Sequence, residues 1–419
     1  MGAFARQVNK KMKTIIKNGR VLNVHTEQYE NKTVVVEGDK IIDLVKSTDV
    51  VGKSDIVIDA AGKFILPGLI DAHVHVTSAT VDLATPQLPV TYTTCCAVKN
   101  LAESLQRGFT TVRDVGGADF GLSMAVSEGI IKGSRLFYCG RALSQTGGHG
   151  DFRAATYDGE YGAPMQSSAT TIGQIADGVT EVRRACRSEL RKGASFIKIM
   201  AAGGVASPGD RVTDTQYSGE ELAAIAEEVK AKGTYIAAHV YSSKSMQICL
   251  KHGVRTIEHG NLLDEETAAI MKDKGAFLIP TVITYDSLNR RGAELNFPVE
   301  SIKKIGSVRV QALEAIRIAR KHRVKVGFGT DLLGPLWEEQ SNEFTIRSTV
   351  ENPMDIIISA TKINAEVLNL SGMLGEISPR AVADILILEK NPVEDISVLT
   401  NSANISAIMQ AGKIIKNTL

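Results

Sequence analysis

One short pattern occurs six times in this chain and constrains its fold more than any other feature. A stretch with helical composition ends in a basic residue and a glycine, and an apolar, strand-like run follows: "QRGFTTVRD", "IKGSRLFYCG", "RKGASFIKIM", "AKGTYIAAHV", "KHGVRTIEHG" and "DKGAFLIPTV". Glycine adopts the left-handed backbone that ends many helices. A basic residue before it suits the negative end of the helix dipole. The pattern therefore predicts repeated helix–strand units.

Two further units extend the series, "KFILPGLIDAHVHV" before it and "HRVKVGFGTD" after it. One helix between them shows clear signals. Ser218 and Glu221 have the spacing of a capping box, and Leu222, Ile225, Ala226 and Val229 follow at helical spacing. Strands that alternate with helices indicate a parallel sheet. Eight such units predict an α/β fold of the (β/α)8 TIM barrel type.

The two ends of the chain have a different pattern. Residues 13–65 contain short runs such as "TIIKNGRVLNV" and "KTVVVEGDKIIDL", which predict hairpins with Asn-Gly and Gly-Asp turns. The C-terminus returns to this pattern with "ADILILEKN" and "ISAIMQAGKIIKN". We therefore expect a small β-sandwich domain built from residues 1–65 and 374–419, with the barrel, residues 66–373, inserted between them.

The ends of the predicted strands carry an unusual set of polar side chains. His73 and His75 must point the same way because side chains alternate along a strand. Four of the chain's eight histidines lie at such ends, together with one lysine and one aspartate: His73, His75, Lys198, His239, His259 and Asp331. The carboxyl ends of barrel strands form one rim, where barrel enzymes hold their active sites. A single histidine there is usually structural, but four favour a metal site.

Lys198 alone has a second interpretation, because a lysine at a barrel strand end can act as a Schiff-base nucleophile. That hypothesis leaves the histidines unexplained. A scaffold or binding protein that has lost its catalytic activity is a further alternative. The presence of all six candidate metal ligands in the sequence argues against it.

The chain resembles the amidohydrolase superfamily in "LPGLIDAHVHV", in the two histidines of the fifth and sixth strands, in "GTD" and in the split β domain with "ADILIL". The resemblance implies two divalent metal ions, for which we expect Zn²⁺, bridged by N-carboxylated Lys198. It implies that His73, His75 and Asp331 bind one ion and that His239 and His259 bind the other. Mononuclear deaminases of the superfamily generally lack the lysine and often have a glutamate shortly after the fifth-strand histidine. "HVYSS" follows here instead, so we expect amide hydrolysis.

Two metal ions that share a hydroxide can activate it near neutral pH. The resemblance then makes Asp331 the residue that takes a proton from the nucleophile and returns it to the departing amine. A cyclic-amide hydrolase or lactonase that uses the same ions stays open as an alternative.

Six further segments are similar to the prolidase-like branch of the superfamily, which cleaves Xaa-Pro dipeptides and N-acyl prolines: "GRALSQTGGHGD", "IKIMAAGGVASPGD", "AAHVYSS", "IEHGNLLD", "PTVITYD" and "GFGTDLLG". Neighbouring branches cleave Xaa-Arg/Lys dipeptides or N-acyl amino acids, including an aromatic mycotoxin amide. We expect His149 and Tyr241 to contact the substrate and assist catalysis, and Arg211 to be a weaker candidate for its carboxylate. Asp210 and Asp214 are the candidates for binding a basic side chain.

Composition narrows the class of partner. The formal net charge of +1 gives no reason to expect a nucleic acid or an anionic membrane. We see no apolar run long enough to span a bilayer and no signal-type segment at the N-terminus. The five cysteines show no disulfide framework. We therefore expect a cytoplasmic enzyme for a small dipeptide or N-acyl amino acid, and a homo-oligomer.

Overall fold

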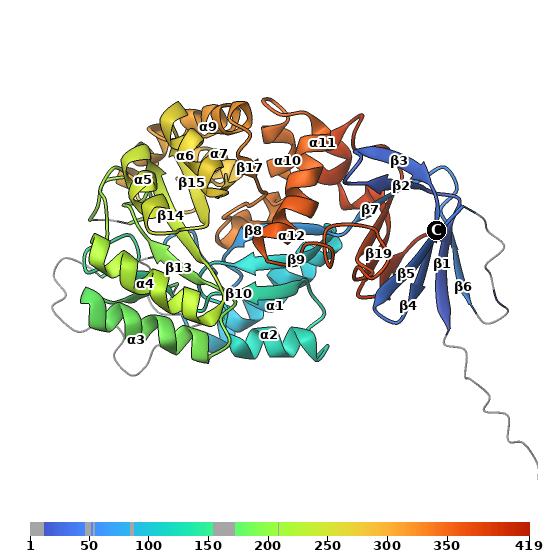
Figure 1. Cartoon of the computed structure of the whole chain (residues 1–419), viewed down its shortest axis with the longest axis horizontal. Helices are drawn as coiled ribbons and strands as arrows, with labels where there is room; N and C mark the ends of the chain where they lie inside the picture. Colours follow the sequence, from blue (N-terminus) through green and yellow to red (C-terminus); the bar gives the residue numbers. More distant parts are fainter. Residues whose placement is uncertain (1–11, 47–51, 53–54, 84–87, 154–171, 208) are drawn as a thin grey trace, which may run out of the picture.

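The computed structural model describes residues 12–46, 52, 55–83, 88–153, 172–207 and 209–419. Within these residues the chain forms a barrel of parallel strands and, beside it, a pair of packed β-sheets made from both ends of the chain (Figure 1). This confirms the predicted fold class. The exact domain boundaries at residues 65 and 374 stay a prediction, and the first of them falls within the strand Phe64–Pro67.

Parallel pairing links the barrel strands in sequence order. The ring closes where the Ala72 amide donates to the Phe328 carbonyl (2.8 Å) and the Asp331 amide donates to the His73 carbonyl (2.8 Å). Two short strands, β10 and β11, together occupy the third position. The strands are β8 (Leu69–Val74), β9 (Phe109–Asp114), β10 (Arg135–Tyr138), β11 (Ala142–Ser144), β13 (Ile197–Met200), β14 (Ile236–Ser242), β15 (Thr256–Leu262), β16 (Phe277–Ile279) and β17 (Lys325–Val326), with β12 (Gly173–Ile175) beside β11.

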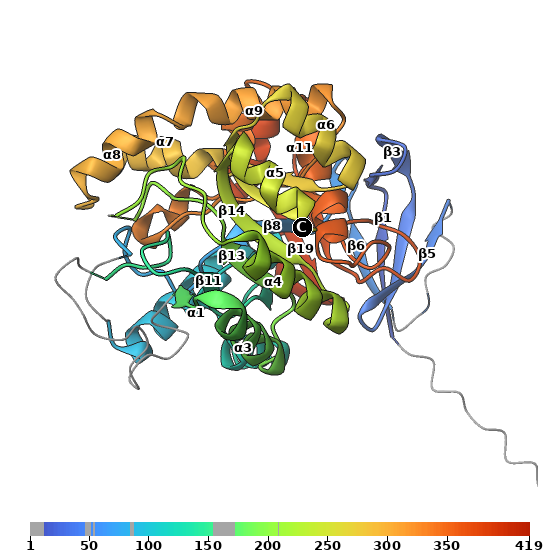
Figure 2. The same cartoon turned by 60° about the vertical axis from the view of Figure 1, so that its left-hand side comes forward.

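Helices lie around the outside of this ring (Figures 1 and 2). They are α1 (Val90–Gln106), α2 (Phe120–Ser127), α3 (Gly178–Arg191), α4 (Gly219–Lys232), α5 (Ser243–Lys251), α6 (Glu265–Lys274), α7 (Val282–Arg291), α8 (Val299–Gly306), α9 (Arg309–Lys321), α10 (Asn342–Arg347), α11 (Pro353–Ile358) and α12 (Asn364–Val367). The capping box of α4 is present, with Ser218 accepting from the Glu221 amide. No helix among the described residues is long and apolar enough to cross a membrane.

The repeated glycine behaves as predicted in five of its six occurrences. The backbone is left-handed at five glycines that follow helices: Gly108, Gly193, Gly233, Gly253 and Gly275. Gly133 differs, because its φ is not positive. A Cβ there would lie 2.7 Å from the Cβ of Leu101, so this glycine serves close packing against α1. The same residue type in the same pattern therefore has two physical causes.

The terminal segments form two sheets. One contains β5 (Lys40–Val45), β4 (Thr33–Glu37), β1 (Lys13–Lys17) and β6 (Ile56–Asp59); the other contains β20 (Lys413–Asn417), β19 (Ile405–Gln410), β18 (Ile385–Leu388), β7 (Phe64–Pro67), β2 (Arg20–Asn23) and β3 (Gln28–Asn31). The Gly-Asp turn closes the predicted hairpin of β4 and β5. The Asn-Gly hairpin prediction is wrong, because β1 pairs with β4 and β6 while β2 pairs with β3 and β7.

The reason for that difference is packing at the turn. Asn18 has a left-handed backbone (φ 63°), and a Cβ on Gly19 would lie 2.4 Å from the Cδ1 of Ile65. The turn therefore carries the chain from one sheet to the other. Strands β1 and β2 therefore lie in different sheets, on opposite sides of the sandwich core. Each contributes a β-branched side chain to that core, Ile16 from β1 and Val21 from β2.

Strand β18 is buried on both faces. Ile385 and Ile387 pack into the core between the two sheets, whereas Leu386 and Leu388 pack toward the barrel. The second group meets residues at the starts of two barrel strands, Leu69 among them. The sandwich is thus attached away from the carboxyl ends of the strands, where the candidate site lies.

Candidate metal centre

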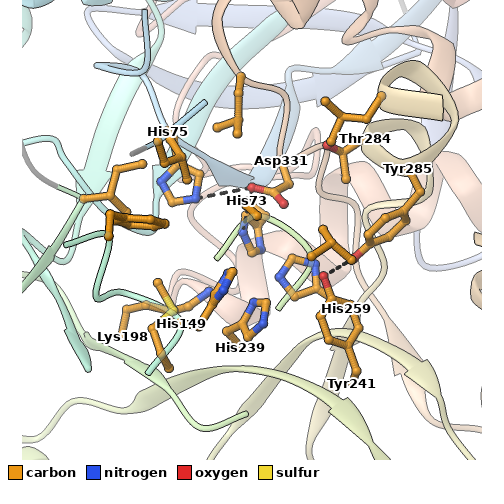
Figure 3. Close-up of a pocket in the computed structure, with 18 residues that line it drawn as sticks. His73, His75, His149, Lys198, His239, Tyr241, His259, Thr284, Tyr285 and Asp331 are labelled. Carbon is orange, nitrogen blue, oxygen red and sulfur yellow. Dashed lines mark hydrogen bonds and ion pairs between the residues drawn. The ribbon is translucent and has the colours of Figure 1, made fainter. Parts of the chain in front are cut away.

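All six candidate metal ligands line a single pocket at the carboxyl ends of the barrel strands, together with His149 and Tyr241 (Figure 3). The pocket encloses about 540 Å³ including its open mouth. Its remaining wall is mostly apolar and consists of Leu83, Phe152, Ile172, Met200, Val205, Ala206, Thr284, Tyr285, Leu288 and Leu333. The structure therefore brings together residues that the chain separates by more than 250 positions, His73 and Asp331.

Strand periodicity places two pairs of these side chains. His73 and His75 come from the end of β8, two residues apart, and both reach the pocket. His239 and Tyr241 share one face of β14 in the same way, as the sequence predicts, and their ring centroids are 4.9 Å apart. The alternation of side chains along a strand is enough to explain both pairs.

Periodicity does not place His259 and Asp331. Each has a left-handed backbone, with φ 72° and 52° respectively, which is strained for a residue with a Cβ. At β15 the unusual φ matters directly. Glu258 points into the barrel toward His73, and the turn of the backbone after it brings the adjacent His259 into the pocket as well. Such strain costs about 1–3 kcal/mol and concentrates at functional sites.

Outer hydrogen bonds orient three of the imidazole rings. The Nδ1 of His73 lies 2.7 Å from Glu258 Oε2, that of His75 lies 2.8 Å from the Gly116 carbonyl, and that of His259 lies 2.8 Å from Thr281 Oγ1. In each ring Nε2 is left for the pocket. Metal-binding histidines usually have this arrangement, because the outer partner fixes the tautomer and the ring plane.

The protonation states also suit a metal. Burial lowers the pKa of both His239 and His259 well below the usual range, so their rings are neutral and keep a free lone pair. Burial likewise lowers the pKa of the Lys198 amine. Burial opposes ionisation of Asp331, but the neighbouring His73 and His75 overcome it and hold the pKa of that carboxyl well below its usual value.

Three of the candidate ligands already converge. The donor atoms of His73, His75 and Asp331 all lie within 4.8 Å of one another. The Nε2 atoms of His73 and His75 are 3.4 and 3.3 Å from Asp331 Oδ1. The rings of His239 and His259 stand beside them, with centroids 4.6 Å apart. A buried set of neutral imidazoles, one carboxylate and one lysine fits divalent metal ions such as Zn²⁺.

Glu258 is a residue that the sequence analysis missed. It is fully buried and bridges His73 to Arg113, whose Nη2 is 2.7 Å from Glu258 Oε1. Burial would raise the pKa of Glu258, but Arg113 and His73 together hold it well below its usual range. Breaking a buried pair of this kind typically costs about 3–5 kcal/mol. Glu258 directly precedes His259 in "IEHG", and strand alternation predicts that such neighbours point to opposite faces.

His149 belongs to a second buried network. Its Nδ1 is 2.8 Å from Ser207 Oγ, and Ser207 in turn donates to the Asp210 carboxylate. A carboxylate only accepts, so the Ser207 oxygen is left to accept from His149 Nδ1–H. The His149 ring stacks on His239 with centroids 4.0 Å apart. Burial lowers the pKa of His149 to about 4, against the opposing effect of Asp210.

Lys304 of α8 holds the loop that carries this network. Its ammonium donates to three backbone carbonyls, those of Gly204, Ser207 and Asp210, at 2.6–3.2 Å. The same loop contributes Val205 and Ala206 to the pocket wall. A cation that gathers three carbonyls in this way fixes the shape of the loop.

Arg211 does not reach the pocket. Its side chain is 85% exposed and pairs with Asp214 at 2.8 Å. The Asp210 carboxylate is occupied by Ser207 and by Gln216 Nε2 (3.0 Å). Neither aspartate lines the pocket, so among the described lining residues the charged side chains are those of Lys198 and Asp331.

Tyr285 is the second residue that the sequence analysis missed. It lies on α7, is 1% exposed, and its hydroxyl donates to the Tyr241 hydroxyl at 3.2 Å (Figure 3). Burial raises the pKa of both phenols, so both keep their protons and act as donors. The segment "PTVITYD" contains Tyr285, but helical spacing alone does not show which side of α7 faces the pocket.

Comparison with known proteins agrees with this geometry. An ochratoxinase from Aspergillus niger is 32% identical over 96% of this chain and 86% of that protein. A crystal structure of a prolidase complexed with N-methylphosphonate-L-proline superimposes with a TM-score of 0.93, at 42% identity, over 97% of this chain and all of the other. A Xaa-Pro dipeptidase with methionine bound in its active site gives 0.86 at 28% identity over 97% of this chain and all of the other. The amidohydrolase family pattern matches residues 64–415, and the chain belongs to the amidohydrolase family.

Proposed function

We propose that this enzyme hydrolyses the amide bond of dipeptides that end in proline, and of N-acyl prolines, with two Zn²⁺ ions and N-carboxylated Lys198. The observation that carries the proposal is the wall of the pocket. Beyond the candidate metal ligands it is mostly apolar, with the Tyr241 hydroxyl as a donor and no further charged side chain among the described residues. A small apolar C-terminal residue suits such a wall.

The metal ions would be held by His73, His75 and Asp331 on one side and by His239 and His259 on the other, with Lys198 between them. Lys198 is 1% exposed and lies on β13, between the strands that carry the two histidine pairs. When bound, the ions polarise the scissile carbonyl and lower the pKa of water. A carbamate on Lys198 would turn a buried cation into an anion, which the charge balance of the site favours.

The chain's own residues then complete the reaction. The Asp331 carboxylate, ionised and 20% exposed, takes a proton from the attacking water in this proposal and delivers it to the departing nitrogen. That nitrogen needs a proton because the proline ring nitrogen leaves as a secondary amine. The Tyr241 hydroxyl donates to the substrate carboxylate beyond the ring, and His149, which stacks on His239, lines the same pocket.

The main rival specificity is a C-terminal arginine or lysine. It requires an acidic residue in the pocket, and the two candidates, Asp210 and Asp214, are engaged by Ser207 and Arg211 and lie outside the lining. A second candidate function is the hydrolysis of N-acyl aromatic amino acids, which the apolar side chains of Phe152, Leu288 and Leu333 favour.

The test is a dipeptide library with varied C-terminal residues, incubated with Zn²⁺-loaded protein, together with N-acetyl-proline and N-acetyl-phenylalanine. We expect the highest kcat/KM for Xaa-Pro, and metal analysis near two ions per chain. Asp331→Asn is the matched inactive control. Faster cleavage of Xaa-Arg, or of N-acetyl-phenylalanine, would replace the proline assignment, and less than one metal ion per chain would remove the binuclear site.

A further inference from the structure

The hydroxyl pair at the pocket has a defined direction. Tyr285 donates its only hydroxyl hydrogen to the Tyr241 oxygen (3.2 Å). The hydrogen of Tyr241 is therefore left for another acceptor, and both side chains line the pocket while being almost fully buried. A buried donor of this kind needs an acceptor, because an unsatisfied hydroxyl costs about 1–3 kcal/mol. A ligand oxygen bound in the pocket would supply that acceptor.

Thr281 extends the same arrangement toward the metal ligands. It stands at the N-cap of α7, where a threonine hydroxyl ordinarily accepts from a backbone amide of the first turn. Here it makes no such bond. Glu343 from α10 accepts from the Ile283 amide in its place, at 2.7 Å. Because Glu343 satisfies that amide, the Thr281 oxygen is available to His259, whose Nδ1 lies 2.8 Å away.

These contacts order the hydrogens from His259 outward. If Nε2 of His259 faces the metal, Nδ1 carries the hydrogen and donates to Thr281. The Thr281 side chain also interacts with the Tyr285 hydroxyl, one helical turn later on α7. Tyr285 then donates to Tyr241. Thr281 thus accepts from His259 and stands beside Tyr285, and the Tyr241 oxygen, which accepts from Tyr285, keeps its own hydrogen for a ligand.

We propose that Tyr285, supported by Thr281, is a positioning residue that fixes the Tyr241 hydroxyl as a hydrogen-bond donor to the α-carboxylate of the substrate. The inference deepens the proposed function and rests on it, because that function supplies the carboxylate. It explains how the site binds an anion although its wall has no arginine or free lysine among the described residues. A neutral donor whose direction is fixed in advance loses little entropy on binding.

The alternative hypothesis is that the Tyr241–Tyr285 hydrogen bond only stabilises the fold. Loss of the Tyr285 hydroxyl would then lower thermal stability and affect all substrates alike, whatever their charge. The two accounts separate when one substrate carries the carboxylate and a matched substrate lacks it. Ala-Pro and Ala-Pro-amide are such a pair, and L-proline and L-prolinamide are the corresponding product-like ligands for a binding measurement without turnover.

The experiment is a double-mutant cycle with Tyr241→Phe, Tyr285→Phe and the combination, each Zn²⁺-loaded. We expect Tyr241→Phe to lower kcat/KM on Ala-Pro by about 10- to 100-fold, because a hydrogen bond to a charged group is lost. Tyr285→Phe should lower it by about 3- to 10-fold, mainly through KM, and by less than about 2-fold when the Tyr241→Phe substitution is already present. Ala-Pro-amide should respond to neither. Calorimetry should show the same losses for L-proline and none for L-prolinamide.

Two further variants sharpen the result. Thr281→Ser keeps the hydroxyl and should keep the wild-type ratio between acid and amide. Thr281→Val should lower that ratio as Tyr285→Phe does, and should add an equal loss for both substrates because the His259 ring loses its Nδ1 partner. Tyr138→Phe is the matched control, because it removes a tyrosine hydroxyl bonded to the Lys192 carbonyl (2.7 Å) outside the pocket. It should lower stability without changing the ratio between acid and amide.

The outcomes separate the inference from the proposed function. Failure of the wild type to cleave Xaa-Pro overturns the function, and the cycle is then run on the best library substrate and its amide. On whichever pair is used, an equal loss for acid and amide, or fully additive effects of the two tyrosines, overturns the role of Tyr285. A loss that is confined to the acid and disappears in the Tyr241→Phe background supports it.

Discussion

The sandwich core and the barrel interior are both buried, but the barrel interior adds paired charges to its apolar side chains, whereas the sandwich core is apolar. Between the sheets, Ile16, Val34 and Ile387 meet other aliphatic groups. Inside the barrel, Arg113 and Glu258 form an ion pair with both side chains 0% exposed. Apolar burial stabilises at about 25 cal/mol per Å², whereas buried charges cost several kcal/mol of desolvation before they interact. The comparison indicates that the sandwich stabilises the fold and the barrel mouth serves the reaction.

The largest effect on activity should come from Lys198→Ala. It removes the proposed bridging ligand between the two histidine pairs, and with it several kcal/mol of transition-state stabilisation, on the order of 10³-fold in rate. Metal analysis should show a lower zinc content, and circular dichroism should show an intact fold. Zinc content and turnover equal to those of the wild type would show that Lys198 is not a metal ligand.

Asp331→Asn should have the second largest effect on activity. An amide cannot take and return a proton, so turnover should fall by at least about 10²-fold. The fold should be retained, because asparagine has the shape of aspartate and also tolerates the left-handed backbone (φ 52°). Thermal unfolding and kcat are the two measurements. Near-native turnover in the folded variant would remove Asp331 from the mechanism.

Glu258→Gln tests the link between the ion pair and the site. It keeps the shape but weakens the bonds to His73 and Arg113, so zinc affinity should fall by about 10- to 100-fold. Competition with a chelator measures this directly. Glu228→Gln, on α4 outside the pocket and paired with Arg187 (2.8 Å), is the matched control and should leave affinity unchanged. Equal zinc affinity in both variants would contradict the orienting role of Glu258.

The smallest effect on activity should come from the sandwich. Ile387→Ala removes a side chain that is 1% exposed and should lower the free energy of unfolding by about 2–5 kcal/mol. Below the unfolding transition, kcat/KM and zinc content should equal those of the wild type. A loss of zinc at a temperature where the protein is folded would show that the two regions are coupled.

Local rules recovered much of the candidate site. Strand alternation predicts that His73 and His75 share a face, and that His239 and Tyr241 do. The same rule misleads at Glu258 and His259, since adjacent strand residues should point apart. A φ of 72° at His259 overrides it. Propensity carries no information on such strain, because the surrounding packing imposes it.

The amino-acid sequence by itself determined the alternation of helices and strands, the two-ended β domain and the residues at the strand ends, because these follow from periodicities of two and 3.6 residues and from short-range turn chemistry. Only the tertiary structure decided that the Asn-Gly turn joins two sheets, that Arg211 stays outside the pocket, and that Tyr285 and Glu258 enter the site. Those outcomes depend on contacts between residues far apart in the chain, such as Glu343 with the first turn of α7, separated by 60 positions. No local pattern encodes them, because each contact forms only when both elements are already in place.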